Sequence, residues 1–228
     1  MKTPKDIVTG KERKKILIVD DHPITRHGLC QLLNHEPDLV VCGEEESAHR
    51  ALAAMKTAQP DLILVDLSLA GKSGLEFIKD LRVLHPEAAV LAVSMHDETI
   101  YAERVLRAGA RGYIMKSEGG AKLLKAIRNI LAGSIYVSEK MSARILDLFA
   151  GSHNRDGGSP LGRLTDREFE VFHLIGQGLG TREIGERLHL SPKTVDTHRL
   201  NIKAKLKFKT LPELMQYAVR WTASESTG

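Results

Sequence analysis

At 228 residues, 42% of them hydrophobic, the chain can fold as one large globular domain or as two small ones. A formal net charge of +4 is too mild to demand a nucleic-acid partner by itself, and two cysteines without metal-ligand spacing argue against a zinc or disulfide scaffold. No apolar run approaches the roughly 18 residues of a membrane span, and the basic N-terminus lacks the apolar stretch of a signal peptide, so we expect a cytoplasmic protein with no membrane partner.

The first half of the chain alternates between strand-like and helix-like segments. Apolar runs predict strands at 16–19, 39–42, 62–65, 89–93 and 112–115. Periodic segments between them predict helices at 23–34, 48–58, 75–84, 98–108 and 121–131. Five such units predict a doubly wound α/β domain of the flavodoxin type, whose five-stranded parallel sheet is covered by helices on both faces.

The second half predicts only helices after a connecting segment. Residues 138–149 could form a connecting helix, and the glycine- and proline-rich stretch 151–162 predicts a flexible linker. Thr165-Asp-Arg-Glu168 is a capping box that starts a helix. Three more helices are expected, at 181–188, 192–206 and 212–221. An all-α domain of four helices, containing a helix-turn-helix, should therefore follow the sheet domain.

Five polar residues should meet at one edge of the predicted sheet. Asp20 and Asp21 end the first strand, Asp66 ends the third, Ser94 ends the fourth and Lys116 follows the fifth. Three neighbouring carboxylates repel one another unless a cation lies among them, and hard oxygen ligands favour Mg²⁺. A hydroxyl and an ammonium beside that cluster suit phosphoryl oxygens. The alternative interpretation is a set of unrelated polar residues that cap helices.

The same residues resemble the signature of receiver domains, over about residues 15–133. The matching motifs are Asp20-Asp21-His22-Pro23, Asp66, Ser94 and Tyr113-Ile-Met-Lys116. The resemblance implies that Asp66 is the phosphoacceptor, a nucleophile toward the phosphohistidine of a sensor kinase. It implies that Asp20 and Asp21 hold Mg²⁺ together with Asp66. Ser94 and Lys116 would bind the phosphoryl group, and Tyr113 would follow Ser94 inward as a switch. Ala70 departs from the proline that is usual in this loop.

A candidate DNA-reading face lies on the helix predicted at 192–206. At about 100° per residue, Val195, His198, Ile202 and Leu206 form an inward stripe. The candidate DNA contacts are Lys193, Thr194, Asp196, Thr197, Leu200, Lys203 and Lys207. Such a mixture suits phosphate and base contacts, although a solvated face of a small bundle would look similar. Asp196 could accept a hydrogen bond from cytosine, or it could pair with Lys193 or Lys203.

The C-terminal motifs resemble the LuxR-type helix-turn-helix, with expected bounds of 163–224. The matching residues are Leu164-Thr-Asp-Arg-Glu168, Ile184, Leu190-Ser-Pro-Lys-Thr-Val195, His198, Asn201-Ile202 and Lys205-Leu206. Joined to a receiver by a linker at 134–162, and preceded by a basic extension at 1–14, the chain resembles the NarL/FixJ class of two-component response regulators. That resemblance implies a sensor histidine kinase, a double-stranded DNA operator and a homodimer formed on phosphorylation as partners, with RNA polymerase as a further candidate.

Two other classes of protein share some of these features. A phosphatase resembling the haloacid dehalogenase family would carry Asp-x-Asp after the first strand, whereas the aspartates here are adjacent and the candidate nucleophile is on the third strand. An interaction protein without working phosphorylation is disfavoured by the presence of Asp66, Ser94 and Lys116. We therefore expect a regulator rather than an enzyme, apart from the receiver's own phosphotransfer and dephosphorylation.

Overall fold

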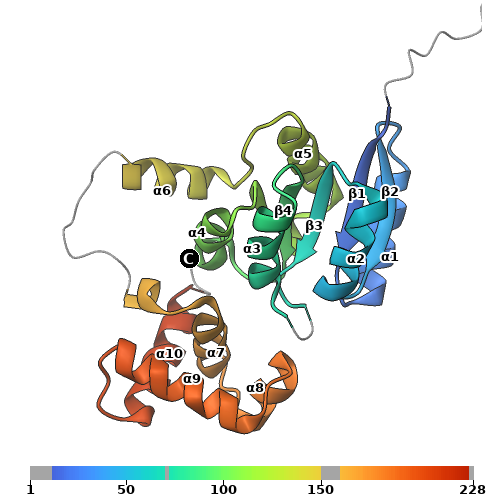
Figure 1. The fold of residues 1–228 in the computed structure, drawn as a ribbon. Coiled ribbons are helices and arrows are strands. Elements are labelled where there is room, and N and C mark those ends of the chain that lie inside the picture. Colours follow the sequence, from blue (N-terminus) through green and yellow to red (C-terminus); the bar gives the residue numbers. More distant parts are fainter. Residues whose placement is uncertain (1–11, 70–71, 150–159, 226–228) are drawn as a thin grey trace, which may run out of the picture.

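The computed structural model describes residues 12–69, 72–149 and 160–225, which form two domains joined side by side (Figure 1). The N-terminal extension up to residue 11, Ala70 and most of the predicted flexible linker therefore lie outside the described residues. Within the described ranges, no helix is both long and apolar enough to cross a bilayer.

A five-stranded parallel sheet forms the centre of the first domain. Its strands are β1 (Lys14–Val19), β2 (Leu39–Glu45), β3 (Leu62–Asp66), β4 (Ala89–Ser94) and β5 (Gly112–Met115). They run in the order β2-β1-β3-β4-β5, so the chain starts near the middle and winds toward both edges. This order confirms the expected doubly wound sheet. It also places the carboxyl ends of β1 and β3 next to each other.

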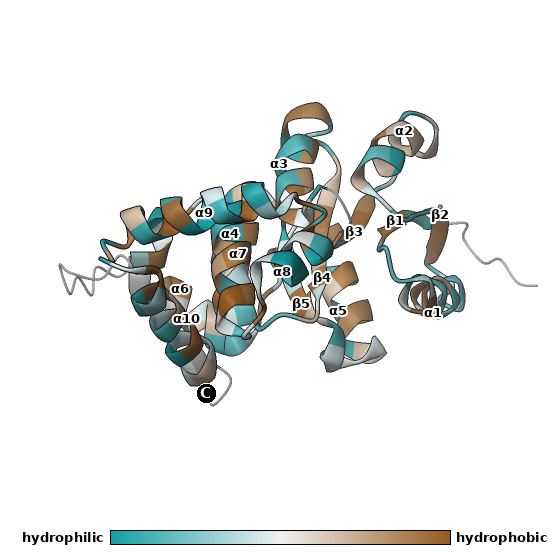
Figure 2. Ribbon diagram, turned by 90° about the horizontal axis from the view of Figure 1, so that it is seen from below, coloured by the Kyte–Doolittle hydropathy of each residue, from teal (hydrophilic) through white to brown (hydrophobic). Residues whose placement is uncertain are grey.

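Five helices cover the two faces of the sheet. They are α1 (Pro23–Asn34), α2 (Ala48–Ala58), α3 (Gly74–Leu84), α4 (Glu98–Ala108) and α5 (Gly120–Leu131). Side chains of a strand alternate between faces, so Ile16 and Ile18 pack under α1 and α5 whereas Leu17 and Val19 pack under α2 and α3. Hydrophobic residues accordingly form much of the strands in Figure 2, and polar residues lie at some strand ends.

The second domain is built from helices alone. Its elements are the 3-10 turn η2 (Pro160–Arg163) and the helices α7 (Asp166–Gly176), α8 (Thr181–Leu188), α9 (Pro192–Lys205) and α10 (Leu211–Glu225). Thr165 and Glu168 form the predicted capping box, and Ser191 caps α9. Gly185 lets α8 approach the turn before α9, because a Cβ there would lie 2.7 Å from the carbonyl oxygen of Leu190.

Two expectations about the connecting segments need correction. Lys14 belongs to β1, where it pairs with Leu39 and forms an ion pair with Asp61 at 2.6 Å, so the basic extension ends one residue earlier than expected. The helix α6 (Glu139–Phe149) is present, but the end of the expected flexible linker is ordered. Leu161 is buried in the hydrophobic core, and its carbonyl oxygen accepts a hydrogen bond from Arg104 of α4.

Candidate phosphoacceptor site and nucleic-acid interface

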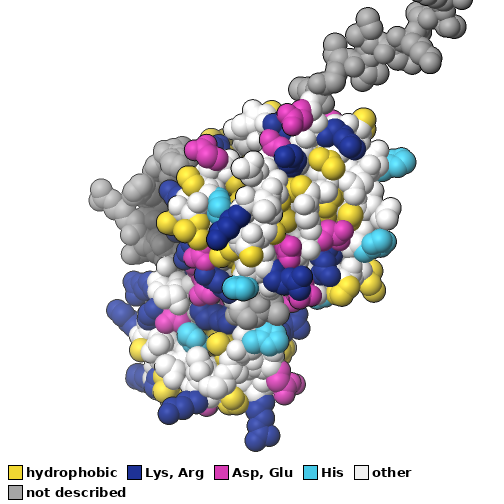
Figure 3. Space-filling model, turned by 45° about the vertical axis from the view of Figure 1, so that its right-hand side comes forward, with side chains coloured by type: hydrophobic (Ala, Val, Ile, Leu, Met, Phe, Trp, Pro, Cys, Tyr) yellow, Lys and Arg dark blue, Asp and Glu magenta, His cyan; other side chains and the backbone are white. Residues whose placement is uncertain are grey.

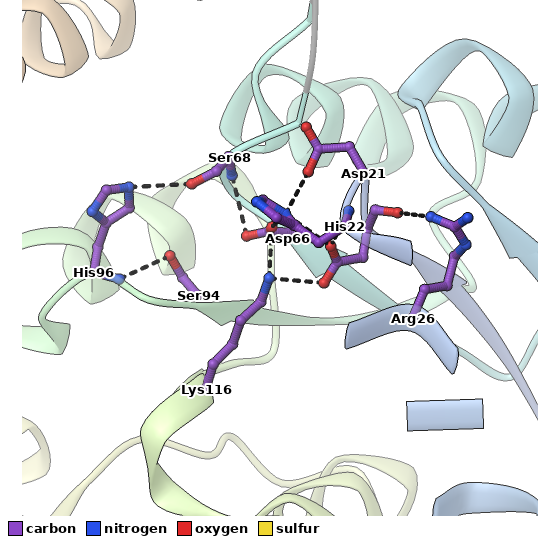
Figure 4. A network of polar contacts seen from close by, with 9 residues as sticks. Asp21, His22, Arg26, Asp66, Ser68, Ser94, His96 and Lys116 are labelled. Carbon is purple, nitrogen blue, oxygen red and sulfur yellow. Dashed lines mark hydrogen bonds and ion pairs between the residues drawn. The ribbon is translucent and has the colours of Figure 1, made fainter. Parts of the chain in front are cut away.

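Three carboxylates meet at the carboxyl edge of the sheet (Figure 4). Asp20 and Asp66 are 1% and 2% exposed, and Asp21 lies at the rim. One oxygen of each carboxylate and a ring nitrogen of His22 all lie within 4.8 Å of one another. The structure thus brings together the three carboxylates that were expected to be neighbours from their positions at the ends of strands. This acidic cluster has the donor atoms to bind a metal ion.

Lys116 places one ammonium among these carboxylates. Its Nζ lies 2.7 Å from Oδ2 of Asp66 and 2.8 Å from Oδ2 of Asp20. Burial raises the pKa of the Asp66 carboxyl above its usual range, and the charge of Lys116 offsets part of that rise. Burial alone would lower the pKa of Lys116, but the charge of Asp66 and the bonds to both carboxylates raise it. Lys116 therefore stays a cation that can pair with an anion bound at Asp66.

His22 also belongs to the cluster, although the sequence argument gave it no role. Its Nδ1 lies 2.7 Å from Oδ1 of Asp21 and 3.3 Å from Oδ1 of Asp20. Its backbone N–H donates to Oδ1 of Asp20 at 2.8 Å. The sequence places His22 directly after the two aspartates. That position alone does not determine whether the His22 ring points toward their carboxylates.

Ser94 is fully buried at the end of β4, and His96 lies directly beyond it. Ser94 Oγ accepts the backbone N–H of His96 at 3.2 Å, and the carbonyl oxygen of His96 accepts the Tyr113 hydroxyl at 2.7 Å. Tyr113 is completely buried. In this structure the ring of Tyr113 already lies inside and its hydroxyl is bonded to the His96 backbone. The expected movement of Tyr113 with Ser94 on phosphorylation stays a prediction.

The second domain packs against α3 and α4 through a cluster of contacts around Arg104. Its guanidinium donates to the carbonyl oxygens of Leu161 at 2.6 Å and Leu164 at 3.2 Å, and to Oδ1 of Asp166 at 3.1 Å. It also lies 4.1 Å above the centre of the Phe169 ring. Lys79 of α3 forms a second ion pair with Asp166. Acidic and basic side chains accordingly gather at the junction of the two domains in Figure 3.

A cavity of about 240 Å³ lies between the acidic edge of the first domain and helices α7 and α8. The first domain lines it with Asp21, His22, Ser68 and His96, and the second domain contributes His173 and Arg187 among others. The second domain therefore forms one wall of the space in front of the carboxylates. A group bound there would face side chains of both domains.

The docking of the domains should weaken as the pH falls, because two histidines are enclosed between them. Burial lowers the pKa of His96 from 6.5 to about 4, and the charges of His173, Arg187 and Lys116 add to this effect. Burial also lowers the pKa of His173, and the charge of Arg187 lowers it further. Separation of the domains would expose both rings further and raise the pKa of each toward its usual value of about 6.5, so the separated form binds more protons below that pH. The stabilisation is complete above about pH 6.5 and declines toward pH 4.

Small-angle X-ray scattering of the unphosphorylated chain would measure this effect. We expect the radius of gyration to increase between pH 7.5 and pH 5.5, and to increase less in His173→Phe, which retains a ring but cannot be protonated. A radius that stays constant over this range in the unaltered protein would show that the enclosed histidines do not hold the domains together.

The face of α9 agrees with the predicted helical wheel at most positions. Val195 and Ile202 are fully buried, and His198 and Leu206 are partly buried on the same inner stripe. The exposed candidate contacts are Lys193, Thr194, Asp196, Thr197 and Leu200. This face stays open to solvent although the second domain packs against the first.

Two lysines differ from the predicted face. Lys203 is half-buried, and its Nζ lies 3.4 Å from the carbonyl oxygen of Lys209. Lys207 is exposed but lies beyond the end of α9, with a positive φ of 61°. The helical wheel put Lys207 on the contact face because it assumed that the helix continued. Both ammonium groups therefore flank the C-terminal end of α9, away from its exposed centre.

The predicted partners of Asp196 were wrong. Its Oδ1 accepts a hydrogen bond from the Thr181 hydroxyl at 3.2 Å and lies 3.5 Å from Arg199 NH1. Lys193 and Lys203, which the sequence argument considered, make no such contact in the described part of the chain. Arg199 also donates to Thr181, so Asp196 helps to join the start of α8 to α9. Its carboxylate nevertheless remains 58% exposed.

Two family models match the chain, each over one of the two domains. The response regulator receiver domain matches residues 16–128, and the luxR family of bacterial regulatory proteins matches residues 162–218. Oxygen regulatory protein NreC of Staphylococcus aureus is 37% identical over 210 residues, which cover 90% of this chain and 97% of that protein. The chain is a response regulator of the NarL/FixJ class.

Solved structures of other response regulators agree with this assignment. A two-component response regulator of the LuxR family from Aurantimonas sp. SI85-9A1 is 33% identical, with a TM-score of 0.56 over 61% of this chain and 99% of that one. RcsB of Salmonella enterica serovar Typhimurium, bound to promoter rprA, shares the fold at 23% identity, with a TM-score of 0.62 over 91% of this chain and 99% of that one. The expected fold class and family are confirmed, and the family consists of DNA-binding regulators rather than phosphatases.

Proposed function

We propose that this response regulator receives a phosphoryl group on Asp66 from a sensor histidine kinase and then binds operator DNA as a homodimer. The observation that carries the proposal is the Asp66 carboxylate, which ends a buried strand 2.7 Å from the ammonium of Lys116. Its neighbours Asp21, His22 and Ser68 line the cavity between the two domains. The receiver would span 14–133 and the DNA-binding domain 160–224, with the linker between them. The protein would act in the cytoplasm, where it could meet the kinase, the operator and RNA polymerase.

The chemistry at Asp66 is a direct transfer. A carboxylate oxygen forms a bond to phosphorus while the bond from phosphorus to the kinase imidazole breaks, and that nitrogen leaves with the electron pair. Lys116 pairs with the phosphoryl oxygens that arrive next to Asp66. Ser94 turns its hydroxyl from the His96 backbone toward another of these oxygens. The protein contributes mainly position and charge, as is usual for phosphoryl transfer.

The donor set of the acidic cluster fits Mg²⁺. Three carboxylates face only one ammonium, so the cluster of Asp20, Asp21, Asp66 and Lys116 retains negative charge that a divalent cation would offset. Carboxylate oxygens are the ligands that Mg²⁺ prefers. Bound there, the ion would neutralise part of the charge on an incoming phosphoryl group. Asp20, Asp21 and Asp66 are the residues that would hold it.

The exposed face of α9 would read the operator from the major groove. Lys193 and Thr194 lie near its start, where they can reach the phosphates. Thr197 and Leu200 lie nearer the centre, and Leu200 is 53% exposed although it is aliphatic, which suits contact with thymine methyl groups. Lys203 and Lys207 would contact phosphates at the other end of the helix.

Sequencing of DNA fragments recovered with the purified full chain tests the proposal as a whole. With Mg²⁺ and a small acyl phosphate present, we expect enrichment of sites made of two related half-sites, because a two-fold symmetric dimer presents two copies of α9. The Asp66→Asn variant should show much weaker enrichment under the same conditions. Recovery of random sequence by both proteins would contradict the proposed function.

The Asp196→Ala variant should lose discrimination at one base pair of the operator. Because the carboxylate lies exposed in the middle of the contact face, we expect a loss of about 1–3 kcal/mol of preference at a single position. Competition binding against a panel of single-base operator variants would measure it. Lys193→Ala provides the contrast, since loss of a phosphate contact should weaken binding to all operator sequences alike. It should also lower the slope of the logarithm of affinity against the logarithm of salt concentration by about one. An equal loss of affinity for every operator in the Asp196→Ala variant would instead show that Asp196 only positions Arg199.

A further inference from the structure

His96 joins three groups of the phosphoacceptor site. Its backbone N–H donates to Ser94 Oγ at 3.2 Å, and its carbonyl oxygen accepts the Tyr113 hydroxyl at 2.7 Å. Its ring Nε2 lies 3.3 Å from Ser68 Oγ (Figure 4). The backbone N–H of Ser68 in turn donates to Oδ1 of Asp66 at 3.2 Å. A change at Asp66 or Ser94 therefore acts on His96 through its backbone and through its ring.

The other side of the same ring supports the DNA-binding domain. The imidazole of His96 stacks on Tyr101 of α4, with centroids 4.7 Å apart and planes at 22°. The ring of His173 in α7 meets it edge-on, at 5.4 Å and 89°. His173 is 6% exposed and also contacts Trp221 of α10 edge-on at 6.2 Å. A continuous set of rings thus leads from the phosphoacceptor site into the second domain.

We propose that His96 is the positioning residue through which phosphorylation of Asp66 changes the docking of the DNA-binding domain. The inference rests on the proposed phosphorylation. When Ser94 turns toward a phosphoryl oxygen, the N–H of His96 loses its acceptor and the loop that carries the ring is released. A shift of the ring removes the surface on which His173 rests, because stacked and edge-on ring contacts depend on position. The docked domain and the bound phosphoryl group therefore favour different positions of His96.

Coupling of this kind must act in both directions. Docking of His173 favours one position of His96, and a bound phosphoryl group favours another. Removal of the His173 ring should therefore tighten the binding of a phosphoryl analogue at Asp66, since coupling between two binding equilibria is reciprocal. A substitution in the DNA-binding domain would thereby alter an affinity measured in the receiver. Any substitution that weakens docking would have this effect, so coupling through His96 itself is tested by combining the His173 and His96 substitutions.

The test uses the full chain with Mg²⁺ and beryllium fluoride as the phosphoryl analogue. Fluorine NMR measures analogue affinity, and hydrogen exchange of the α7 amides measures docking. We expect analogue binding to speed α7 exchange in the unaltered protein but not in His96→Ala. His173→Ala should bind the analogue about two- to tenfold more tightly, the range expected for one aromatic pair. The double variant, which carries His96→Ala and His173→Ala, should show the same analogue affinity and α7 exchange as either single variant. Both substitutions remove the same contact between the two rings.

Two further variants serve as controls. His49→Ala removes an exposed imidazole on α2 and should behave as the unaltered protein does. His96→Phe keeps a ring against Tyr101 and His173 and should retain most of the response in α7. Additive effects in the double variant, or an unchanged α7 response in His96→Ala, would overturn the inference while leaving phosphorylation at Asp66 intact. Failure of the unaltered protein to bind the analogue would contradict the proposed function and, with it, this coupling.

Discussion

The Asp66→Asn variant should gain no phosphoryl group from Mg²⁺ and a small acyl phosphate, whereas the unaltered protein should gain one. Asparagine preserves the size of the side chain but replaces the nucleophilic carboxylate oxygens and removes one negative charge. Lys116 would keep its partner Asp20, at 2.8 Å, so the site should stay folded. We expect the rate of phosphorylation to fall by at least about 10³-fold, as for removal of other enzymatic nucleophiles.

Intact-mass spectrometry measures the added group, and its lability to base distinguishes an acyl phosphate from a phosphoester. The matched control is Asp80→Asn, because Asp80 lies on α3 and pairs with Lys72 away from the carboxylate cluster. That variant should be phosphorylated at the unaltered rate. Equal rates in Asp66→Asn and the unaltered protein would place the phosphoacceptor elsewhere.

The Arg104→Ala variant should release the DNA-binding domain from the receiver. The Arg104 side chain is only 15% exposed and lies over the Phe169 ring. Its guanidinium donates hydrogen bonds to the carbonyl oxygens of Leu161 and Leu164 and to the Asp166 carboxylate. Its removal therefore leaves these three acceptors with fewer donors. Truncation of one partner in a buried, hydrogen-bonded charge pair costs about 2–5 kcal/mol at an interface. Hydrogen exchange of the α7 amides should accelerate by about 30-fold or more in the unphosphorylated chain, if exchange proceeds through separation of the domains.

Arg107 provides the control for this substitution, because it lies on the same helix but points outward. Its side chain is 74% exposed and pairs with Glu103 one turn earlier. Exposed pairs of this kind contribute at most about 1 kcal/mol, so Arg107→Ala should leave α7 exchange nearly unchanged. Similar exchange in both variants would show that Arg104 does not hold the domains together.

The amino-acid sequence alone determined the sheet and the composition of its acidic edge. Continuous apolar runs such as residues 62–65 identify strands covered on both faces. Parallel strands bring their carboxyl ends to one edge whatever the details of packing. Asp20, Asp66, Ser94 and Lys116 could therefore be placed together before any coordinates were known. The same applies to Val195 and Ile202, because helical periodicity assigns the inner stripe of α9.

Only the tertiary structure decided which side chains meet across the two domains. His96 and His173 are separated by many residues in the chain, and no local pattern makes their rings touch. The hydroxyl of the buried Tyr113 donates to the His96 backbone, and Arg104 donates to the carbonyl oxygen of the buried Leu161. Periodicity reports which face of an element is buried, whereas the docking of two domains depends on the shape and charge of surfaces built from distant segments.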